Sequence, residues 1–363
     1  METADLTTPA ALVDVDRMLS NLDRMAAYVK GNALALHPHV KTHKTPALAM
    51  EQLRRGAQGV TVATIREATL MAEVCDDILL AYPPVGTPRI EGIFALPESV
   101  TVTVAHESAA ALDALATAAS AAGRNIGVLI EMDVGMRRVG LRDAADIVAL
   151  AARATDAPGI DYRGVLFYPG HIRQHVSEQG QALDELAGIL DERVEALRDA
   201  GLAPDVVSGG STPAAFASHR LPALTSIRPG TYIFNDRTTA RLGACHADDC
   251  ALTVLARVVS TAVPGQAVVD AGSKALGREP LRAGDHDGFG EVLDQPDVIV
   301  RAMSEEHGIL DLTRSDWRPA VGELVRIVPN HVCYVVNLHA HLHALSGGSI
   351  VETWPVRARG WTS

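Results

Sequence analysis

Short apolar runs alternate with alanine-rich, helix-like stretches along the first two thirds of the chain. The stretches PALAMEQLRRGA and ESAAALDALATAASAAG, for example, carry apolar residues at helical spacing between two such runs. Strands that alternate with helices predict a parallel sheet, and eight of them fit a closed (β/α)8 TIM barrel better than an open sheet. The eight runs cover residues 33–40, 59–64, 77–84, 100–106, 126–135, 164–170, 205–210 and 226–236.

The pattern changes after about residue 245. Valine-rich runs and Pro-Gly turns replace the helical spacing, as in ALTVLARVVSTAVPGQAVVDAGSKAL and ELVRIVPNHVCYVVNLHAHLHAL. This pattern predicts a β-domain, either a barrel or a sandwich. We expect the α/β barrel over residues 16–245 and the C-terminal β-domain over 246–363, with residues 1–15 as a candidate to pair with it. The polar segment GDHDGFGE (284–291) predicts a turn.

Composition and charge narrow the possible partners. With 47% hydrophobic and 21% charged residues, the 363-residue chain has the composition of an ordinary globular protein. A formal net charge of -12 argues against nucleic acid. No apolar run approaches the ~20 residues of a membrane span, and the N-terminus lacks the order of a signal peptide. We expect a cytoplasmic protein whose four cysteines stay reduced.

Polar residues stand where the predicted barrel strands end, which is where barrel enzymes place their functional groups. Lys41 closes the first run, Arg137 and Arg138 follow the fifth, and Tyr168 and His171 follow the sixth. The glycine- and hydroxyl-rich segments after the seventh run and within the eighth can bind a phosphate through backbone N–H groups. The residues concerned are Ser208, Gly209, Gly210, Ser211, Thr212, Gly230 and Tyr232.

A lysine and a phosphate site at one barrel mouth suggest pyridoxal phosphate (PLP), which needs an amine for its Schiff base and a cradle for its phosphate. The alternative interpretation of Lys41 is a solvated surface lysine, the commonest kind. Lys41 directly follows HPHV, however, and Lys44 is the better candidate for a surface charge at a helix start. We expect His37, His39 and His43 to shape the surroundings of Lys41 rather than to bind a metal ion.

HPHVKTHK resembles the PLP-lysine motif of the fold-type III family that includes D-threonine aldolases and eukaryotic-type D-serine dehydratases. TPAALVDVD, EMDVGMRRVG, SGGSTP, RPGTYIFND and PNHVCYVVNLH also resemble this family, so the likeness extends from residue 8 to about 340. It implies an alanine racemase-like barrel, a C-terminal β-domain, PLP, a divalent metal and a homodimer. Lys41 would be the Schiff-base lysine, Arg138 would contact the cofactor ring and Tyr168 would lie close to it. The residues that the resemblance assigns to the phosphate are Gly210, Ser211, Thr212, Gly230 and Tyr232.

His331 and Cys333 form the candidate metal site. On a strand, residues two apart face the same side, and the resemblance places the metal ligands at this pair. D-threonine aldolases have a similar motif in which aspartate takes the place of the cysteine. The dehydratase branch has cysteine at this position, as this chain does. A thiolate with an imidazole favours Zn²⁺, with Mn²⁺ or Mg²⁺ as alternatives.

Two neighbouring groups of possible ligands are expected not to bind the ion. CHADDC (245–250) has the spacing of a loop or helix start rather than of a zinc site. His339, His341 and His343 alternate along a predicted strand and are expected to line the metal site or its entrance.

The resemblance implies a lyase that acts on a small D-3-hydroxy amino acid, and we expect a dehydratase. D-Serine, D-threonine or D-3-hydroxyaspartate would give a 2-oxo acid and ammonia, with the Lys41 amine removing the α-proton and the metal assisting loss of the 3-hydroxyl. The alternative is retro-aldol cleavage to glycine and an aldehyde, in which His171 or His175 deprotonates the 3-hydroxyl. An amino-acid racemase or a non-catalytic PLP carrier fits less well, because neither needs the His–Cys pair.

Overall fold

The computed structural model describes residues 1–281 and 288–360. Contacts within the chain divide it into two compact units. One contains Met25–Lys41 and Pro46–Gly230 and is called the barrel unit here. The other contains Met1–Arg24, Thr42–Thr45 and Thr231–Gly360 and is called the β unit.

The barrel unit is built on eight parallel strands. Their order in the sheet is β2-β9-β8-β7-β6-β5-β4-β3, so each strand from β3 to β9 lies beside its neighbour in sequence. An isolated parallel bridge joins His39 to Thr61, next to the two ends of this order, and the sheet therefore closes. The predicted (β/α)8 barrel is confirmed. The strands are β2 (Ala35–Leu36), β3 (Val60–Val62), β4 (Asp77–Leu80), β5 (Thr101–His106), β6 (Ile126–Met132), β7 (Ile160–Phe167), β8 (Val206–Gly209) and β9 (Ser226–Ile227).

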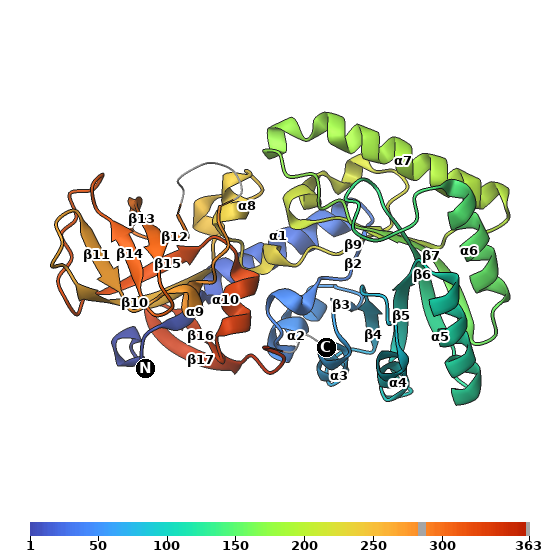
Figure 1. The fold of residues 1–363 in the computed structure, drawn as a ribbon, viewed down its shortest axis with the longest axis horizontal. Coiled ribbons are helices and arrows are strands. Elements are labelled where there is room, and N and C mark those ends of the chain that lie inside the picture. The colour runs from blue at the N-terminus through green and yellow to red at the C-terminus, as the bar shows by residue number, and fades with distance from the viewer. Residues whose placement is uncertain (282–287, 361–363) are drawn as a thin grey trace. The chain divides into compact units, whose positions relative to one another are not determined.

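Amphipathic helices cover the outside of these strands (Figure 1). Ser108 caps one of them, α5, by accepting from the Ala111 N–H, and the left-handed Gly123 ends it. The buried positions of α5, which include Leu112 and Leu115, recur at helical spacing and fix the face that packs inward. The helices of this unit are α2 (Pro46–Arg54), α3 (Ile65–Met71), α4 (Thr87–Phe94), α5 (Ala109–Ala122), α6 (Ala144–Asp156) and α7 (Gly180–Asp199).

The β unit contains a nine-stranded sheet in the order β11-β14-β13-β12-β15-β10-β1-β16-β17. Because β10 also pairs with β11, the strands from β11 to β10 close into an antiparallel barrel. The predicted β-rich region is thus a barrel with an extension. The strands are β1 (Ala10–Asp14), β10 (Leu252–Ser260), β11 (Gln266–Val269), β12 (Gly290–Val292), β13 (Gln295–Met303), β14 (Gly308–Asp311), β15 (Leu324–Pro329), β16 (His341–Ser346) and β17 (Ser349–Pro355).

The N-terminal strand β1 lies inside this sheet. It pairs antiparallel with β10 and parallel with β16. Leu12 at its centre is fully buried and belongs to a core cluster with Leu255 and Leu345. Residues 10–14 therefore complete a sheet whose other strands come from the last third of the chain.

The segment after His331, which the sequence predicts to be a strand, is helical. His331 and the two residues after it lie at the start of α10 (Val332–Leu338), not on a strand, so the strand prediction for HVC is wrong. The β-branched valines suggested a strand, but Val332, Val335 and Val336 are the buried residues and have helical spacing.

Further helices complete the description. The segment 245–250 contains a 3-10 turn, as predicted, whereas the turn predicted over 284–291 lies partly outside the described residues. No helix in residues 1–281 and 288–360 is long and apolar enough to cross a membrane. The remaining helices are η1 (Thr3–Asp5), α1 (Val15–Gly31), η2 (Val40–Thr42), η3 (Val176–Glu178), η4 (Thr212–Arg220), η5 (Thr231–Ile233), α8 (Arg237–Arg241), η6 (Ala247–Asp249) and α9 (Ser273–Leu276).

Candidate active site

Lys41 lies at the carboxyl end of the first barrel strand, in η2, and its side chain is exposed. Two backbone bonds hold the segment that leads to it against the end of the last strand. The His37 N–H donates to the Ile227 carbonyl at 3.0 Å, and the His39 N–H donates to the Pro229 carbonyl at 3.0 Å. The lysine therefore extends from a fixed backbone at the barrel mouth.

The histidines around Lys41 have protein contacts or cationic neighbours, which disfavours a metal ion there. His37 contacts Ser226 Oγ at 3.0 Å and Asp77 Oδ2 at 3.3 Å. The buried His43 accepts from the Thr45 N–H at 3.2 Å. Burial lowers the pKa of His39 well below its ordinary value, and the nearby charges of Lys41, Arg228 and Arg138 lower it further. His39 is therefore a neutral ring among cations.

Lys44 is not a surface charge, and that prediction is wrong. The residue is buried and has a positive φ of 55°. Its Nζ donates to Asn337 Oδ1 at 3.0 Å and to the Ala358 carbonyl at 3.4 Å. Because both partners lie near the end of the chain, local sequence could not reveal them.

Arg138, Tyr168 and His171 come together at the ends of β6 and β7. The Arg138 guanidinium carbon lies 5.1 Å from the centre of the Tyr168 ring, within the range of a cation–π contact. A Cβ on Gly135 would lie 3.0 Å from His171 ring atoms, so this histidine packs against the loop that carries Arg138. His175 caps η3, and its Nδ1 lies 2.8 Å from Ser177 Oγ. His171 is therefore the better placed of the two predicted histidines.

The segment from Ser208 to Thr212 has the features of a phosphate cradle. A Cβ on Gly209 would lie 2.1 Å from the Phe167 ring, and Gly210 has a φ of 94°, so both positions require glycine. Ser211 precedes η4, and Thr212 is its first residue. The buried Ser211 Oγ has no hydrogen-bond partner among the described residues. A buried, unpaired hydroxyl beside a glycine turn fits the phosphate of PLP.

The other phosphate candidates differ in surroundings. Ser208 Oγ accepts from Arg228 Nε at 3.0 Å, so this hydroxyl holds an arginine. Gly230 follows Arg228 and Pro229 and is the last residue of this part of the barrel unit. Tyr232 lies in η5 of the β unit with its side chain buried.

Three buried polar residues of the barrel were missed in the sequence. Arg228 donates to the Phe167 carbonyl at 2.7 Å, and burial lowers its pKa to about 10. Burial raises the pKa of Glu131, an effect that the charges of Arg228 and Arg138 oppose. Burial also lowers the pKa of His106 to about 4. The available signal was a charged or polar residue in or after an apolar strand run, as in IGVLIEM, VTVTVAH and SIRPG.

His331 and Cys333 are brought together at the start of α10. His331 Nδ1 lies 3.0 Å from Oδ2 of the fully buried Asp236, and Cys333 Sγ lies 3.4 Å from Thr42 Oγ1. Burial lowers the pKa of His331, but the charge of Cys333 and the hydrogen bond with Asp236 outweigh it and raise this pKa to about 11. The pair thus places a nitrogen and a sulfur donor beside each other.

This donor set fits a catalytic rather than a structural metal. No group of three or more His, Cys, Asp or Glu side chains in the described parts of the chain is arranged to hold an ion. Structural zinc sites use four protein ligands, whereas catalytic sites leave positions open for water or substrate. One thiolate and one imidazole would leave such positions open.

His339 and His343 each contact another group of the β unit. His339 ends α10, and its Nε2 lies 3.0 Å from the Ala275 carbonyl, so the prediction that it shares a strand with His341 and His343 is wrong. His341 and His343 share β16, with ring centres 6.4 Å apart, and His343 Nδ1 lies 3.1 Å from Thr353 Oγ1.

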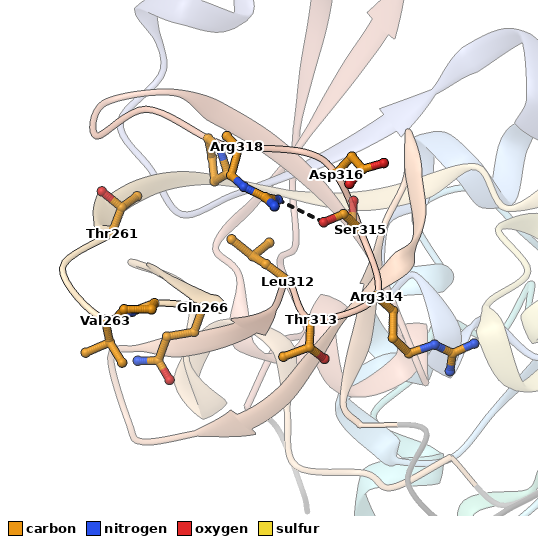
Figure 2. A pocket seen from close by; sticks show the side chains of 12 residues that line it. Thr261, Val263, Gln266, Leu312, Thr313, Arg314, Ser315, Asp316 and Arg318 are labelled. Atoms are coloured by element: carbon orange, nitrogen blue, oxygen red, sulfur yellow. Dashed lines mark hydrogen bonds between the residues drawn. The ribbon is translucent and has the colours of Figure 1, made fainter.

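A hollow of about 810 Å³ in the β unit lies between the loop 261–266 and the segment 312–319 (Figure 2). Arg318 donates to the Ser315 carbonyl at 2.8 Å along its edge. None of the predicted site residues lines this hollow.

A closed parallel barrel with a lysine after its first strand and a glycine-hydroxyl cradle after its seventh defines a PLP-dependent enzyme of the alanine racemase fold. The family described as "Alanine racemase, N-terminal domain" matches residues 13–238. The family described as "Putative serine dehydratase domain" matches residues 251–345.

Relatives of known activity match over nearly the whole chain. D-threonine aldolase from Arthrobacter sp. is 31% identical, with 99% of this chain and 94% of the aldolase covered. D-threo-3-hydroxyaspartate dehydratase from Delftia sp. (strain HT23) is 35% identical, with 98% of each chain covered. The crystal structure of D-threonine aldolase from Filomicrobium marinum superposes with a TM-score of 0.93 at 32% identity, covering 100% of this chain and 98% of that one.

Two solved variants of D-threo-3-hydroxyaspartate dehydratase are also similar, each at 32% identity and with 99% of this chain covered. In one, a histidine is replaced by alanine (TM-score 0.92, 97% of that chain covered). In the other, a cysteine two positions further on is replaced by alanine, and this structure is described as metal-free (TM-score 0.89, 100% of that chain covered). The chain belongs to the fold-type III family of D-threonine aldolases and D-serine dehydratases, and it is a PLP-dependent lyase of D-hydroxy amino acids.

Proposed function

We propose that this lyase is a dehydratase that converts a D-3-hydroxy amino acid into a 2-oxo acid and ammonia, with zinc held by His331 and Cys333. The observation that carries the proposal is the cysteine. In the similar dehydratase, the histidine and cysteine replaced by alanine stand two positions apart, as His331 and Cys333 do here, and the cysteine variant is metal-free. A thiolate–imidazole pair favours zinc over manganese or magnesium.

The barrel residues supply the cofactor site. Lys41 would carry PLP covalently, the Gly210–Thr212 turn would hold its phosphate, and Arg138 and Tyr168 would contact its ring. When bound, PLP supplies a sink for the electrons released at the substrate's α-carbon, and the metal supplies a Lewis acid at the 3-hydroxyl. Lys41 Nζ takes the α-proton. The neutral His39 neighbours this amine without adding a further positive charge.

Product analysis separates elimination from the alternative reaction. The purified protein is incubated with D-serine, D-threonine and D-threo-3-hydroxyaspartate, each with added zinc and with a chelator. We expect ammonia and the matching 2-oxo acid in equal amounts, with activity lost to the chelator and restored by zinc. Glycine and an aldehyde would contradict the proposal and identify an aldolase.

The Cys333→Asp variant tests the role of the thiolate, with Cys75→Ser as a control in a cysteine outside the candidate site. A carboxylate is a harder ligand, so manganese should replace zinc as the preferred activator of the variant. The control should keep the preference of the wild-type protein. An unchanged preference for zinc in Cys333→Asp would remove the cysteine as the basis of the metal assignment.

The family resemblance also supports a homodimer, and the acidic composition with few cysteines supports a location in the cytoplasm. Sedimentation velocity of the purified protein, read as one or two copies of the 38.4 kDa chain, tests the oligomeric state.

A further inference from the structure

Asp236 is a buried carboxylate that no predicted function uses. It is 0% exposed and stands just before α8 in the β unit. Burying a carboxylate is costly unless its oxygens accept hydrogen bonds, so the partners of each oxygen show what holds the residue in place.

The two oxygens of Asp236 serve different elements. Oδ1 caps α8 by accepting from the Thr239 N–H at 2.8 Å and from Thr239 Oγ1 at 3.0 Å. Oδ2 accepts from the Val332 N–H at 3.3 Å and lies 3.0 Å from His331 Nδ1. Capping α8 needs one oxygen only, and a serine would supply it. The second oxygen therefore serves the start of α10.

The backbone around His331 is fixed by the same segment. Thr238 Oγ1 donates to the Asn330 carbonyl at 2.7 Å, and Arg237 donates to Asn330 Oδ1 at 2.7 Å. His331 itself gives α10 no side-chain cap, so its ring is not occupied by the helix end. With the backbone held by residues 237–238, the His331 ring is oriented by its contact with Asp236 and by the Tyr334 ring, whose centre lies 5.5 Å away.

We propose that Asp236 is a positioning residue that fixes the proton of His331 on Nδ1 and directs Nε2, beside the Cys333 sulfur, toward the metal. Asp236 Oδ2 already accepts from the Val332 N–H, and the Nδ1 of His331 is placed as a second donor to the same oxygen. Histidines that bind metals usually donate their other ring N–H to such a partner, and loss of that partner typically weakens metal binding by 10–100-fold. The inference rests on the metal assignment of the proposed function.

The test measures zinc affinity by competition with a chelator, in the full-length protein. Asp236→Ser keeps the cap of α8 but is too short to reach His331, and we expect it to weaken zinc binding about 10–100-fold. Thr239→Val is the matched control, because it disrupts the same cap without touching the imidazole. It should lower the thermal midpoint of the metal-free protein while leaving zinc affinity within about twofold.

Two further measurements, on the Asp236→Asn variant and by NMR, test the inference if the serine variant does not fold. The asparagine has the same shape without the charge, and zinc affinity should again fall. In the zinc-loaded wild-type protein, the imidazole nitrogen shifts of His331, assigned by comparison with His331→Gln, should show the proton on Nδ1 and the metal on Nε2. A metal-bound Nδ1 would overturn the inference.

The outcomes also separate this inference from the proposed function. In one outcome, the wild-type protein binds zinc tightly, Cys333→Ala weakens this binding and Asp236→Ser leaves it unchanged. That outcome would overturn the role of Asp236 alone. A wild-type protein without zinc affinity would overturn the metal assignment and, with it, this inference.

Discussion

Lys41 combines an exposed side chain with a fixed backbone. The amine is exposed, while backbone hydrogen bonds tie the preceding segment to the end of the last strand. A covalent carrier of a cofactor needs both properties, because the bond must form and break while its position stays constant.

We expect Lys41→Ala to lose the visible Schiff-base band of the PLP-loaded protein together with all measurable lyase activity. Lys30→Ala, at the end of α1, is the control and should keep both. Reduction with borohydride followed by peptide mass spectrometry locates the attached cofactor. A modified peptide without Lys41 would contradict the assignment.

His106 should make the protein sensitive to acid. Burial lowers its pKa from 6.5 to about 4, so the folded state favours the neutral ring. Above a pH of about 6.5 the ring is neutral in both the folded and the unfolded chain, and it costs no stability. As the pH falls from there toward 4, the unfolded chain binds a proton that the folded protein does not, so the free energy of unfolding decreases. Linkage gives a loss of roughly 2 kcal/mol in the free energy of unfolding between pH 7 and 4.5.

The variant His106→Leu removes that titration. Denaturant unfolding of both proteins at pH 7 and 4.5 should show a smaller loss of stability in the variant. Equal losses in the two proteins would show that His106 does not contribute to the acid sensitivity.

At the scale of elements, the barrel was predictable because its information is local. Each barrel strand is a short apolar run, and each helix shows its spacing within one stretch, as in IGVLIEM and ESAAALDALATAASAAG. The start of α10 was misread because β-branched residues masked a helical spacing. Lys44, Arg228 and Asp236 could not be assigned, since their partners lie far away in the sequence.

The contact between β7 and β8 should tolerate no side chain at Gly209. A methyl group there would lie 2.1 Å from the buried Phe167 ring, so Gly209→Ala should destabilise the protein by roughly 1–3 kcal/mol. Gly188→Ala is the control, because nothing lies within 4 Å of its added Cβ. Gly188 lies on the exposed face of α7, so its replacement by alanine should stabilise the protein by about 0.5–1 kcal/mol. Thermal midpoints should move in opposite directions; a fall in both would contradict the packing argument.

At the scale of the whole molecule, the chain contributes to the β unit in three separate segments. These are Met1–Arg24, Thr42–Thr45 and Thr231–Gly360, and the first supplies the inner strand β1. Without β1, strands β10 and β16 would each expose a row of unpaired backbone groups.

Deletion of residues 1–14 should therefore unfold or aggregate the β unit, although the deleted residues are far from 252–346 in sequence. Deletion of residues 1–5, which stops short of β1, is the control and should leave a soluble protein. Sedimentation and zinc affinity of the two truncated proteins measure the effect. A soluble, zinc-binding protein after the longer deletion would show that β1 is dispensable.

The inner position of β1 also constrains the order in which the protein forms during synthesis. Residues 10–14 leave the ribosome before their partners, which begin at residue 252 and follow only after the whole barrel has been made. At about 5–20 residues per second, the strand must wait on the order of tens of seconds. The barrel can fold in that interval, whereas the first strand remains exposed and is the segment that a chaperone would have to protect.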